Sequence, residues 1–220
     1  MRQFNKIEQL TFWRGHEEAF KGGVVARVVL SLASKYIGKN ALDIGAGDGA
    51  LVDHFHNLFR DKRIWAMDLV PKSQEVMAGD CTSLQYASNS FDTLFCTDVI
   101  EHLSDEDLDK CLREASRVLQ KNGYGIFATL NNENLSKSMV TCPECGVKFH
   151  RYGHGQVFTE SKIKKLFASS GFQVVTVRKI NLHLLSLFGV AARIFYFLRL
   201  ESVVPFKWLT ADLFFVVKKI

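Results

Sequence analysis

Short apolar runs alternate with amphipathic stretches along most of the chain. Apolar runs of four to eight residues that end in glycine or acidic residues are typical of buried strands, whereas apolar positions every three to four residues indicate helices. Strands are predicted at 41–44, 63–69, 73–79, 91–96, 124–130, 172–180 and 211–218, with the third the weakest. Helices are predicted before and between them, at 10–36 with an interruption at Gly22-Gly23, and at 50–60, 105–119 and 159–170. The alternation predicts an α/β fold with a mostly parallel sheet covered by helices on both faces.

The ends of two predicted helices carry recognisable signals. Ser104 is a suitable N-cap for the helix over 105–119, and the acidic residues after it favour the positive end of the helix dipole. Gly171 follows the helix over 159–170 at the position where a left-handed residue usually ends a helix. Ligands of such sheets bind at the carboxyl ends of the strands, so the strand ends are where a site is expected.

Composition adds limits to this picture. The chain has 220 residues, of which 47% are hydrophobic, and this is enough for one domain with a substantial core. The net charge of +5 comes without a dense Lys/Arg run, so there is no strong nucleic-acid signal. The first residues lack the apolar region of a signal peptide, and five cysteines are an odd number for a disulfide framework. A cytoplasmic protein is expected.

A glycine loop follows the first predicted strand and suggests the kind of ligand. Its sequence, Asp43-Ile-Gly45-Ala-Gly47-Asp-Gly49, lets the backbone turn sharply and approach a ligand closely. The spacing differs from the Gly-x-Gly-x-x-Gly of dinucleotide sites, and Asp43 would repel a pyrophosphate but attract a cation. Asp68 ends the second strand about twenty residues later, where a carboxylate can accept from a ribose hydroxyl. The expected ligand carries a ribose and a positive charge.

Four segments in order resemble the motifs of class I S-adenosylmethionine-dependent methyltransferases. They are ALDIGAGDG (41–49), AMDL (66–69), AGDC (78–81) and FDTLFCTDVIEHL (91–103). The resemblance covers roughly residues 40 to 180, and the final strand fits as well. It implies a Rossmann-like sheet of seven strands in which the last is antiparallel. The chain is divided accordingly into a helical cap (1–39) and a methyltransferase domain (40–220) that carries two inserts, a Cys/His loop (131–158) and an apolar helix (181–208).

The resemblance also implies roles for individual residues. The methionine end of the cofactor would lie on the glycine loop, the ribose on Asp68, the adenine on Leu69 and Asp80, and the transferred methyl group near the end of the fourth strand. The implied cofactor-binding residues are Asp43, Gly45, Ala46, Gly47, Asp68, Leu69, Asp80, Cys81, Thr97 and Asp98. One departure concerns the stretch between Asp68 and Gly79, which is too short for the helix usual there. One face of the sheet is therefore expected to be thinly covered.

Motifs that are absent from the sequence limit the possible classes of methyl acceptor. After the fourth strand stands Thr97-Asp98-Val99-Ile100, without the Asn/Asp-Pro-Pro-aromatic run of enzymes that methylate base amino groups and without a Pro-Cys pair. The segment Glu101-His102-Leu103 resembles the branch that methylates small molecules. His102 is a candidate general base with Glu101 beside it; the alternative is that both residues merely lead into the helix capped by Ser104.

Two cysteines and two histidines gather in the long loop. Cys142, Cys145, His150 and His154 form a Cys-x2-Cys-x4-His-x3-His pattern, and four such ligands suit a tetrahedral zinc ion that would brace the loop. Two alternatives stay open. The cysteines could form a redox pair, and His154 could reach the substrate as a catalytic residue, as the resemblance of the segment 154–159 to many relatives implies.

The apolar stretch 182–200 is nearly long enough to span a membrane, but Arg193 and the return of the last strand to the sheet argue against it. It could cap a hydrophobic pocket, form a dimer contact, lie at a membrane surface or simply pack on the sheet. The expected function is methyl transfer to an oxygen of a small-molecule or glycan- or lipid-linked acceptor. The alternatives are an RNA or protein methyltransferase and a non-catalytic S-adenosylmethionine-binding regulatory module.

Overall fold

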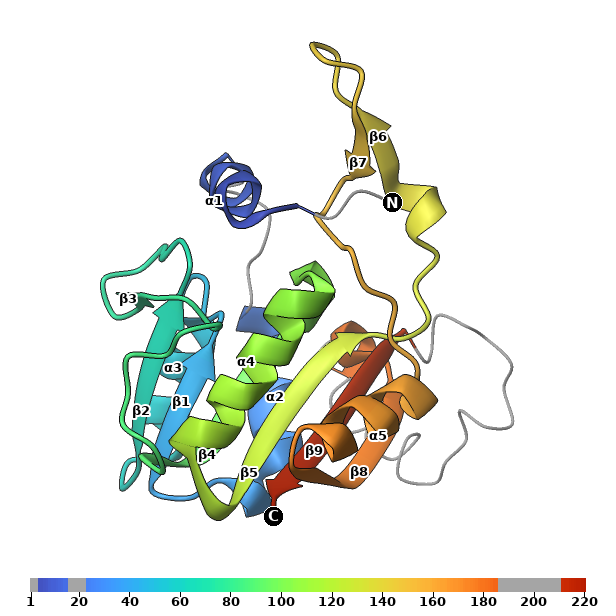
Figure 1. Cartoon of the computed structure of the whole chain (residues 1–220). Coiled ribbons are helices and arrows are strands. Elements are labelled where there is room, and N and C mark those ends of the chain that lie inside the picture. The colour runs from blue at the N-terminus through green and yellow to red at the C-terminus, as the bar shows by residue number, and fades with distance from the viewer. Residues whose placement is uncertain (1–3, 16–22, 186–210) are drawn as a thin grey trace.

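A single mixed sheet organises the chain. The computed structural model describes residues 4–15, 23–185 and 211–220, and its sheet has seven strands in the order β3-β2-β1-β4-β5-β9-β8 (Figure 1). The strands are β1 (Asn40–Ile44), β2 (Arg63–Asp68), β3 (Met77–Ala78), β4 (Phe91–Thr97), β5 (Leu119–Leu130), β8 (Phe172–Ile180) and β9 (Asp212–Lys219). Pairs from β3 to β5 are parallel, and β9 runs antiparallel to both β5 and β8. The predicted fold class is confirmed.

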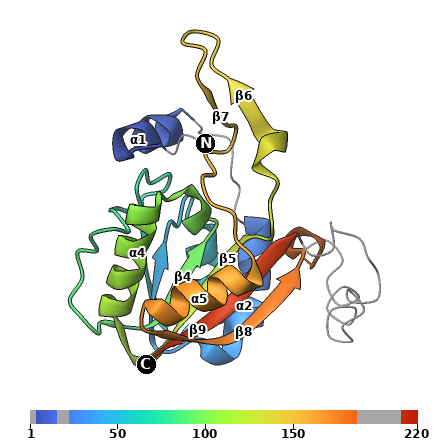
Figure 2. The same cartoon turned by 45° about the vertical axis from the view of Figure 1, so that its right-hand side comes forward.

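Helices cover both faces of this sheet. In Figures 1 and 2, α4 (Asp105–Val118) and α5 (Glu160–Ser169) lie on one face, and α2 (Gly23–Ala33) and α3 (Ala50–Leu58) lie on the other. Each face has its own cluster of buried side chains. On the α4 and α5 face, Phe127 of β5 stacks on Phe215 of β9 with ring centroids 5.3 Å apart. The sheet is thus buried on both sides, as a mostly parallel sheet requires.

The caps expected from the sequence hold the ends of the helices on this face. The Ser104 side chain accepts a hydrogen bond from the Asp107 N–H, and Leu108, Leu112 and Ala115 of α4 are buried. Thr159, predicted as the first residue of the next helix, instead caps α5 by accepting from the Lys162 N–H. Gly171 follows α5 with φ at +81°, a left-handed conformation that favours glycine.

The sheet is less fully covered near β2 and β3. The connections 69–76 and 79–90, which the structure describes throughout, contain turns and no α-helix. Trp65 and Met77 are accordingly among the exposed large hydrophobic residues. The thin covering expected between Asp68 and Gly79 is therefore present.

The N-terminal region is helical, as predicted over 10–36, but its first helix begins earlier than Leu10. It contains α1 (Lys6–Arg14), then α2, then a 3-10 turn, η1 (Ser34–Tyr36), and residues 16–22 lie outside the described part. The second helix begins at Gly23, one of the two glycines where the interruption was predicted. α2 packs against the sheet, with Val29, Leu30 and Ala33 fully buried, whereas α1 lies apart from the sheet beside the 139–150 hairpin (Figure 1).

The long loop after β5 forms a projecting arm. It begins with η3 (Leu135–Ser138) and continues as a two-stranded hairpin of β6 (Met139–Thr141) and β7 (Lys148–His150). Figures 1 and 2 both show this hairpin standing away from the main body. Another short 3-10 turn, η2 (Ile100–His102), links β4 to α4.

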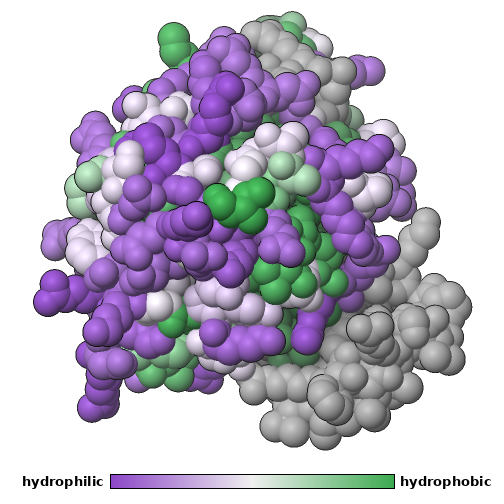
Figure 3. Space-filling view, turned by 60° about the horizontal axis from the view of Figure 1, so that its bottom comes forward, coloured by the Kyte–Doolittle hydropathy of each residue, from purple (hydrophilic) through white to green (hydrophobic). Residues whose placement is uncertain are grey.

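Most of the predicted apolar insert at 181–208 lies outside the described residues. Of its first residues, Leu182 and Leu185 are buried in the cluster on the α2 and α3 face. Among the described helices, none combines the length and the hydropathy that crossing a membrane requires. The face shown in Figure 3 is mostly hydrophilic, with hydrophobic residues in smaller areas between the polar ones.

We expect the aromatic cluster on the α4 and α5 face to contribute strongly to stability. Phe215 is fully buried and contacts both Phe127 and Phe167. Phe215→Ala should lower the free energy of unfolding by about 3–5 kcal/mol, because the side chain leaves a cavity that its neighbours fill only partly. Leu58→Ala, at a position 53% exposed, is the control and should cost less than about 1 kcal/mol. Urea titration followed by circular dichroism measures both, and equal losses would contradict the assignment.

Candidate functional site

A cavity of about 410 Å³ opens at the carboxyl ends of β1, β2 and β4. This volume is within the range of small-molecule sites. All ten residues that the sequence predicted for cofactor binding line it: Asp43, Gly45, Ala46, Gly47, Asp68, Leu69, Asp80, Cys81, Thr97 and Asp98. Parallel strands bring their carboxyl ends to one edge of the sheet, and this explains how motifs far apart in sequence meet here.

The glycine loop forms the floor of the cavity. The N–H groups of Gly45 and Ala46 donate to the Met67 carbonyl at 2.8 and 3.0 Å, which ties the loop to β2. Gly45 has a φ of +77°, and a Cβ there would lie 2.2 Å from a methyl carbon of Val99. Gly47 also has a positive φ, +54°, but no atom lies within 4 Å of the position that a Cβ would take there. Gly45 is therefore required by packing, whereas Gly47 leaves open space for a ligand.

Asp68 is held in place at the end of β2. Its two carboxylate oxygens accept hydrogen bonds from the N–H groups of Gly47 at 2.9 Å and Val70 at 2.8 Å. Burial nevertheless raises its pKa above the ordinary value. The carboxylate keeps further lone pairs for the hydroxyl groups of a ligand.

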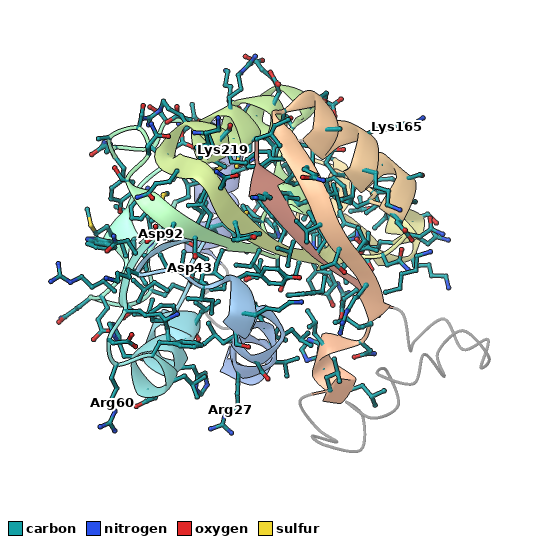
Figure 4. All side chains as sticks on the ribbon, turned by 90° about the horizontal axis from the view of Figure 1, so that it is seen from below. Arg27, Asp43, Arg60, Asp92, Lys165 and Lys219 are labelled. Atoms are coloured by element: carbon teal, nitrogen blue, oxygen red, sulfur yellow. The ribbon has the colours of Figure 1, made fainter. Side chains whose placement is uncertain are left out.

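Two further carboxyl groups line the same wall: Asp43, which is buried, and Asp98, which is exposed. Burial raises the pKa of Asp43 to about 7, with a smaller contribution from the nearby Asp68. Desolvation also raises the pKa of Asp98 to about 7, with Asp212 adding to the effect and His154 opposing it. Figure 4 shows Asp43 inside the body of the molecule, in contrast to Arg27 and Arg60, which extend outward. Carboxyl groups in such surroundings favour a ligand that brings positive charge.

Helix α1 supplies a wall that the sequence did not predict. Lys6, Gln9 and Trp13 line the cavity, and the Lys6 ammonium group forms an ion pair with Asp80. Burial acts to raise the pKa of Asp80, but hydrogen bonds from Lys6 and Thr82 outweigh it and leave the pKa below its ordinary value. His183 lines the cavity as well. No motif marks these residues; α1 carries only the general features of a short helix.

The three predicted catalytic residues occupy different places. His102 lines the cavity, where its ring lies edge-on to Trp13 with centroids 4.8 Å apart. Burial, together with His154, lowers the pKa of His102 to about 3, so the imidazole is neutral. Glu101 and His154 are buried and do not line the cavity. Burial and the nearby Asp98 raise the pKa of Glu101 well above its ordinary value. Direct contact with a substrate is thus supported for His102 alone.

His154 instead belongs to a buried hydrogen-bond network with Glu133, a residue that the sequence did not indicate. A Glu133 carboxylate oxygen lies 2.6 Å from His154 Nδ1, and the other lies 3.5 Å from His150 Nε2. The His154 ring is 4.7 Å from the His102 ring, centroid to centroid. The network therefore joins the base of the arm to the residue at the cavity wall.

The side chains of Glu133, His150 and His154 have ligand atoms close enough to surround a metal ion. The hydrogen bonds argue against it. His150 Nδ1 accepts the His154 backbone N–H at 3.2 Å, so in the neutral ring Nε2 carries the proton and has no lone pair to offer. A metal-bound histidine usually donates from its other nitrogen, and here that nitrogen accepts.

The predicted zinc set of Cys142, Cys145, His150 and His154 is not assembled. Met139 pairs with His150 at the base of the hairpin, while the Cys142 N–H donates to Val147 at its tip. Three residues of extended chain separate these positions by roughly 10 Å. Among the described residues, no group of three potential metal ligands includes either cysteine. The four-ligand prediction is therefore corrected, because the hairpin holds its two ends apart.

Comparisons with known proteins point to methyltransferases. The methyltransferase domain family matches residues 42–127. Uncharacterized methyltransferases from Bacillus cereus and Bacillus cytotoxicus are each 26% identical over 155 residues, covering 63% of this chain and 72% of theirs.

Solved structures show the same fold. A Burkholderia thailandensis 1,6-didemethyltoxoflavin-N1-methyltransferase, with bound 1,6-didemethyltoxoflavin and S-adenosylhomocysteine, aligns with a TM-score of 0.67 at 14% identity, over 97% of this chain and 86% of its own. The Haemonchus contortus phosphoethanolamine N-methyltransferase 2, in complex with S-adenosylmethionine, aligns with a TM-score of 0.61 at 16% identity, over 94% and 60%.

The motifs, the fold and these matches together support a class I S-adenosylmethionine-dependent methyltransferase. The cavity fits the cofactor. Gly47 leaves open space for close approach, and Asp68 presents a carboxylate at the end of β2. Among the described hydrogen bonds and ion pairs, neither the buried Asp43 nor the exposed Asp98 has a cationic partner.

We expect cofactor binding to depend on pH. Asp43, with its raised pKa of about 7, is largely protonated in the empty protein below that pH, and the cationic cofactor favours the carboxylate. Binding should therefore release protons, and affinity should rise by up to about tenfold per pH unit and level off above about pH 7. Isothermal titration at pH 6, in two buffers of different ionisation enthalpy, measures the release. Asp43→Asn should reduce it, and the exposed Asp61→Asn should not. Binding without proton release would contradict the assignment.

Proposed function

We propose that the protein transfers the methyl group of S-adenosylmethionine to an oxygen atom of a small-molecule or glycan- or lipid-linked acceptor. The supporting observation is that Asp98 and His102 both line the cavity, beside apolar residues such as Trp13, Val29 and Leu103. The cofactor, when bound, supplies a sulfonium-linked methyl group for in-line displacement. The hydroxyl oxygen gains the methyl, the sulfonium becomes a thioether, and the hydroxyl proton must be accepted by the protein.

The need for a proton acceptor is what favours oxygen over nitrogen. A neutral amine attacks a methyl group with its own lone pair, whereas a hydroxyl group is a weak nucleophile until its proton is removed. A base is most effective when its pKa lies near the working pH. Asp98, with a pKa of about 7, meets this condition, and it follows Thr97 at the end of β4.

His102 suits a different role. Its pKa of about 3 makes it a poor proton acceptor, but it keeps the ring neutral at every physiological pH. A neutral imidazole can orient a hydroxyl group by a hydrogen bond while Asp98 takes the proton. We assign His102 to binding and orientation of the acceptor. His154 and Glu133 act through it as positioning residues, since neither lines the cavity.

The size and cover of the cavity support a small acceptor. Trp13, Val25, Val29 and Leu103 give it apolar walls, and α1 lies across it through the Lys6 contact with Asp80. A flat apolar ring or chain would be buried by these walls, whereas a folded RNA or protein would require α1 to move. The structural neighbour with bound 1,6-didemethyltoxoflavin also acts on a small molecule, although at nitrogen.

A direct test separates the candidate functions. The protein is incubated with S-adenosylmethionine and panels of phenols, polyprenyl and glycosidic alcohols, amines, RNA and proteins, and S-adenosylhomocysteine is measured. Turnover with hydroxyl acceptors is the expected result. Turnover confined to amines would overturn the oxygen assignment, and turnover with RNA or protein would overturn the small-molecule class. Tight cofactor binding without turnover on any panel would favour the non-catalytic module.

The role of Asp98 gives a second prediction. At saturating cofactor, kcat should rise with pH and reach half its maximum at or below pH 7, because the bound cation lowers the pKa of Asp98 from about 7. Asp98→Asn should lower kcat by about 10²–10⁴-fold and remove this pH dependence. Asp61→Asn, at an exposed position, is the matched control. An Asp98→Asn variant with the pH profile of the wild type would exclude the residue as the base.

A further inference from the structure

The tip of the hairpin arm is the one prominent motif that methyl transfer does not use. The base of the arm contacts the N-terminal region. The ring centroids of Phe149 in β7 and Phe4, which precedes α1, are 5.9 Å apart, and Gly153 approaches the ring of Phe12 in α1. The tip carries Cys142 and Cys145 and stands clear of the body in Figures 1 and 2. Cys145 is exposed and Cys142 is partly exposed. The pair is therefore open to solvent and to other molecules.

The turn between the strands holds both sulfurs in a compact arrangement. The Cys142 N–H donates to Val147 and the Gly146 N–H donates to the Cys142 carbonyl, each at 2.9 Å. Gly146 has a φ of +68°, which this tight turn requires. Two cysteines held in one tight turn can act as a bidentate ligand for a thiophilic metal ion.

The part of the chain that the structure describes does not complete such a site. A structural zinc ion is bound by four ligands. Among the described residues, no third histidine, cysteine or carboxylate joins the two cysteines. Of the other three cysteines, Cys96 and Cys111 are buried, and Cys81 lines the cofactor cavity.

We propose that Cys142 and Cys145 are half of a tetrahedral zinc site, and that the same pair from a second copy of this chain supplies the other half. A two-fold contact of this kind uses the same surface on both subunits and closes without further copies. The projection of the hairpin lets two tips meet while the bodies stay apart. Each tip also carries an exposed acidic residue, Glu144, and an exposed basic one, Lys148, so a two-fold arrangement can place opposite charges together.

Cobalt substitution tests the site on the full-length protein. Metal is removed with a chelator under reducing conditions, and Co²⁺ is added while absorbance and light-scattering mass are followed. We expect saturation at one ion per two chains, a thiolate-to-cobalt charge-transfer band with the intensity of four thiolates, and a doubling of mass. Zinc should displace the cobalt and keep the dimer. Activity is not a readout, so the result is independent of the proposed methyl transfer.

Variants make the outcome decisive. Cys142→Ser and Cys145→Ser should each abolish the four-thiolate band and the dimer, whereas His150→Gln should leave both unchanged. One ion per chain on a monomer with a two-thiolate band would overturn the second-copy assignment. No uptake by the reduced protein, or uptake that survives replacement of both cysteines, would overturn the site. Rapid formation of a Cys142–Cys145 disulfide without metal uptake would instead assign the pair to redox chemistry.

Discussion

Asp43 and Asp98 are carried by adjacent parallel strands, β1 and β4, and both reach the same cavity. Each has a pKa raised to about 7, mainly by desolvation, because the charged form loses water and gains little in return. Such a pair costs stability in the empty protein and favours a cationic occupant. The glycine loop, the end of β2 and the cover provided by α1 all surround this pair. The site thus holds two carboxyl groups, Asp43 buried and Asp98 exposed, at the cavity in which a cationic cofactor is expected.

The thin covering of the sheet and the position of α1 are connected. The connections 69–76 and 79–90 lack helices, and this leaves the adenine side of the cavity with little secondary structure around it. Lys6 reaches Asp80 on that side, and Gln9 donates to the His102 carbonyl at 3.2 Å on the other. α1 therefore bridges the two ends of the cavity. A cofactor whose adenine amino group used Asp80, as the motif resemblance implies, would share that carboxylate with Lys6.

The sequence was sufficient to predict the sheet and the cavity residues. It was not sufficient to predict which residues of α1 and of the hairpin arm contact them. Asp43, Asp68 and Asp98 follow strands, and parallel topology brings strand ends together, so their positions could be predicted. Trp13 and Glu133 lie in segments without a motif, and their contacts with His102 and His154 depend on how α1 and the arm fold back. The predicted zinc ligands fail for the opposite reason, because residues that are close in sequence are not close in space. Close spacing in sequence suggested one site, yet extended strands keep the ends of a hairpin apart.

The arm is joined to the active site by backbone as well as by side chains. The N–H groups of Gly155 and Gln156 both donate to the Glu101 carbonyl, at 2.8 and 3.0 Å, where the chain returns from the hairpin. Glu101 precedes His102, so a displacement of the arm would be transmitted to the residue that orients the acceptor. Glu133 adds a second link through His154. A metal ion that joins two hairpin tips would restrain this arm from its far end. Zinc would then act on methyl transfer through the position of His102, without any direct contact with the reacting atoms.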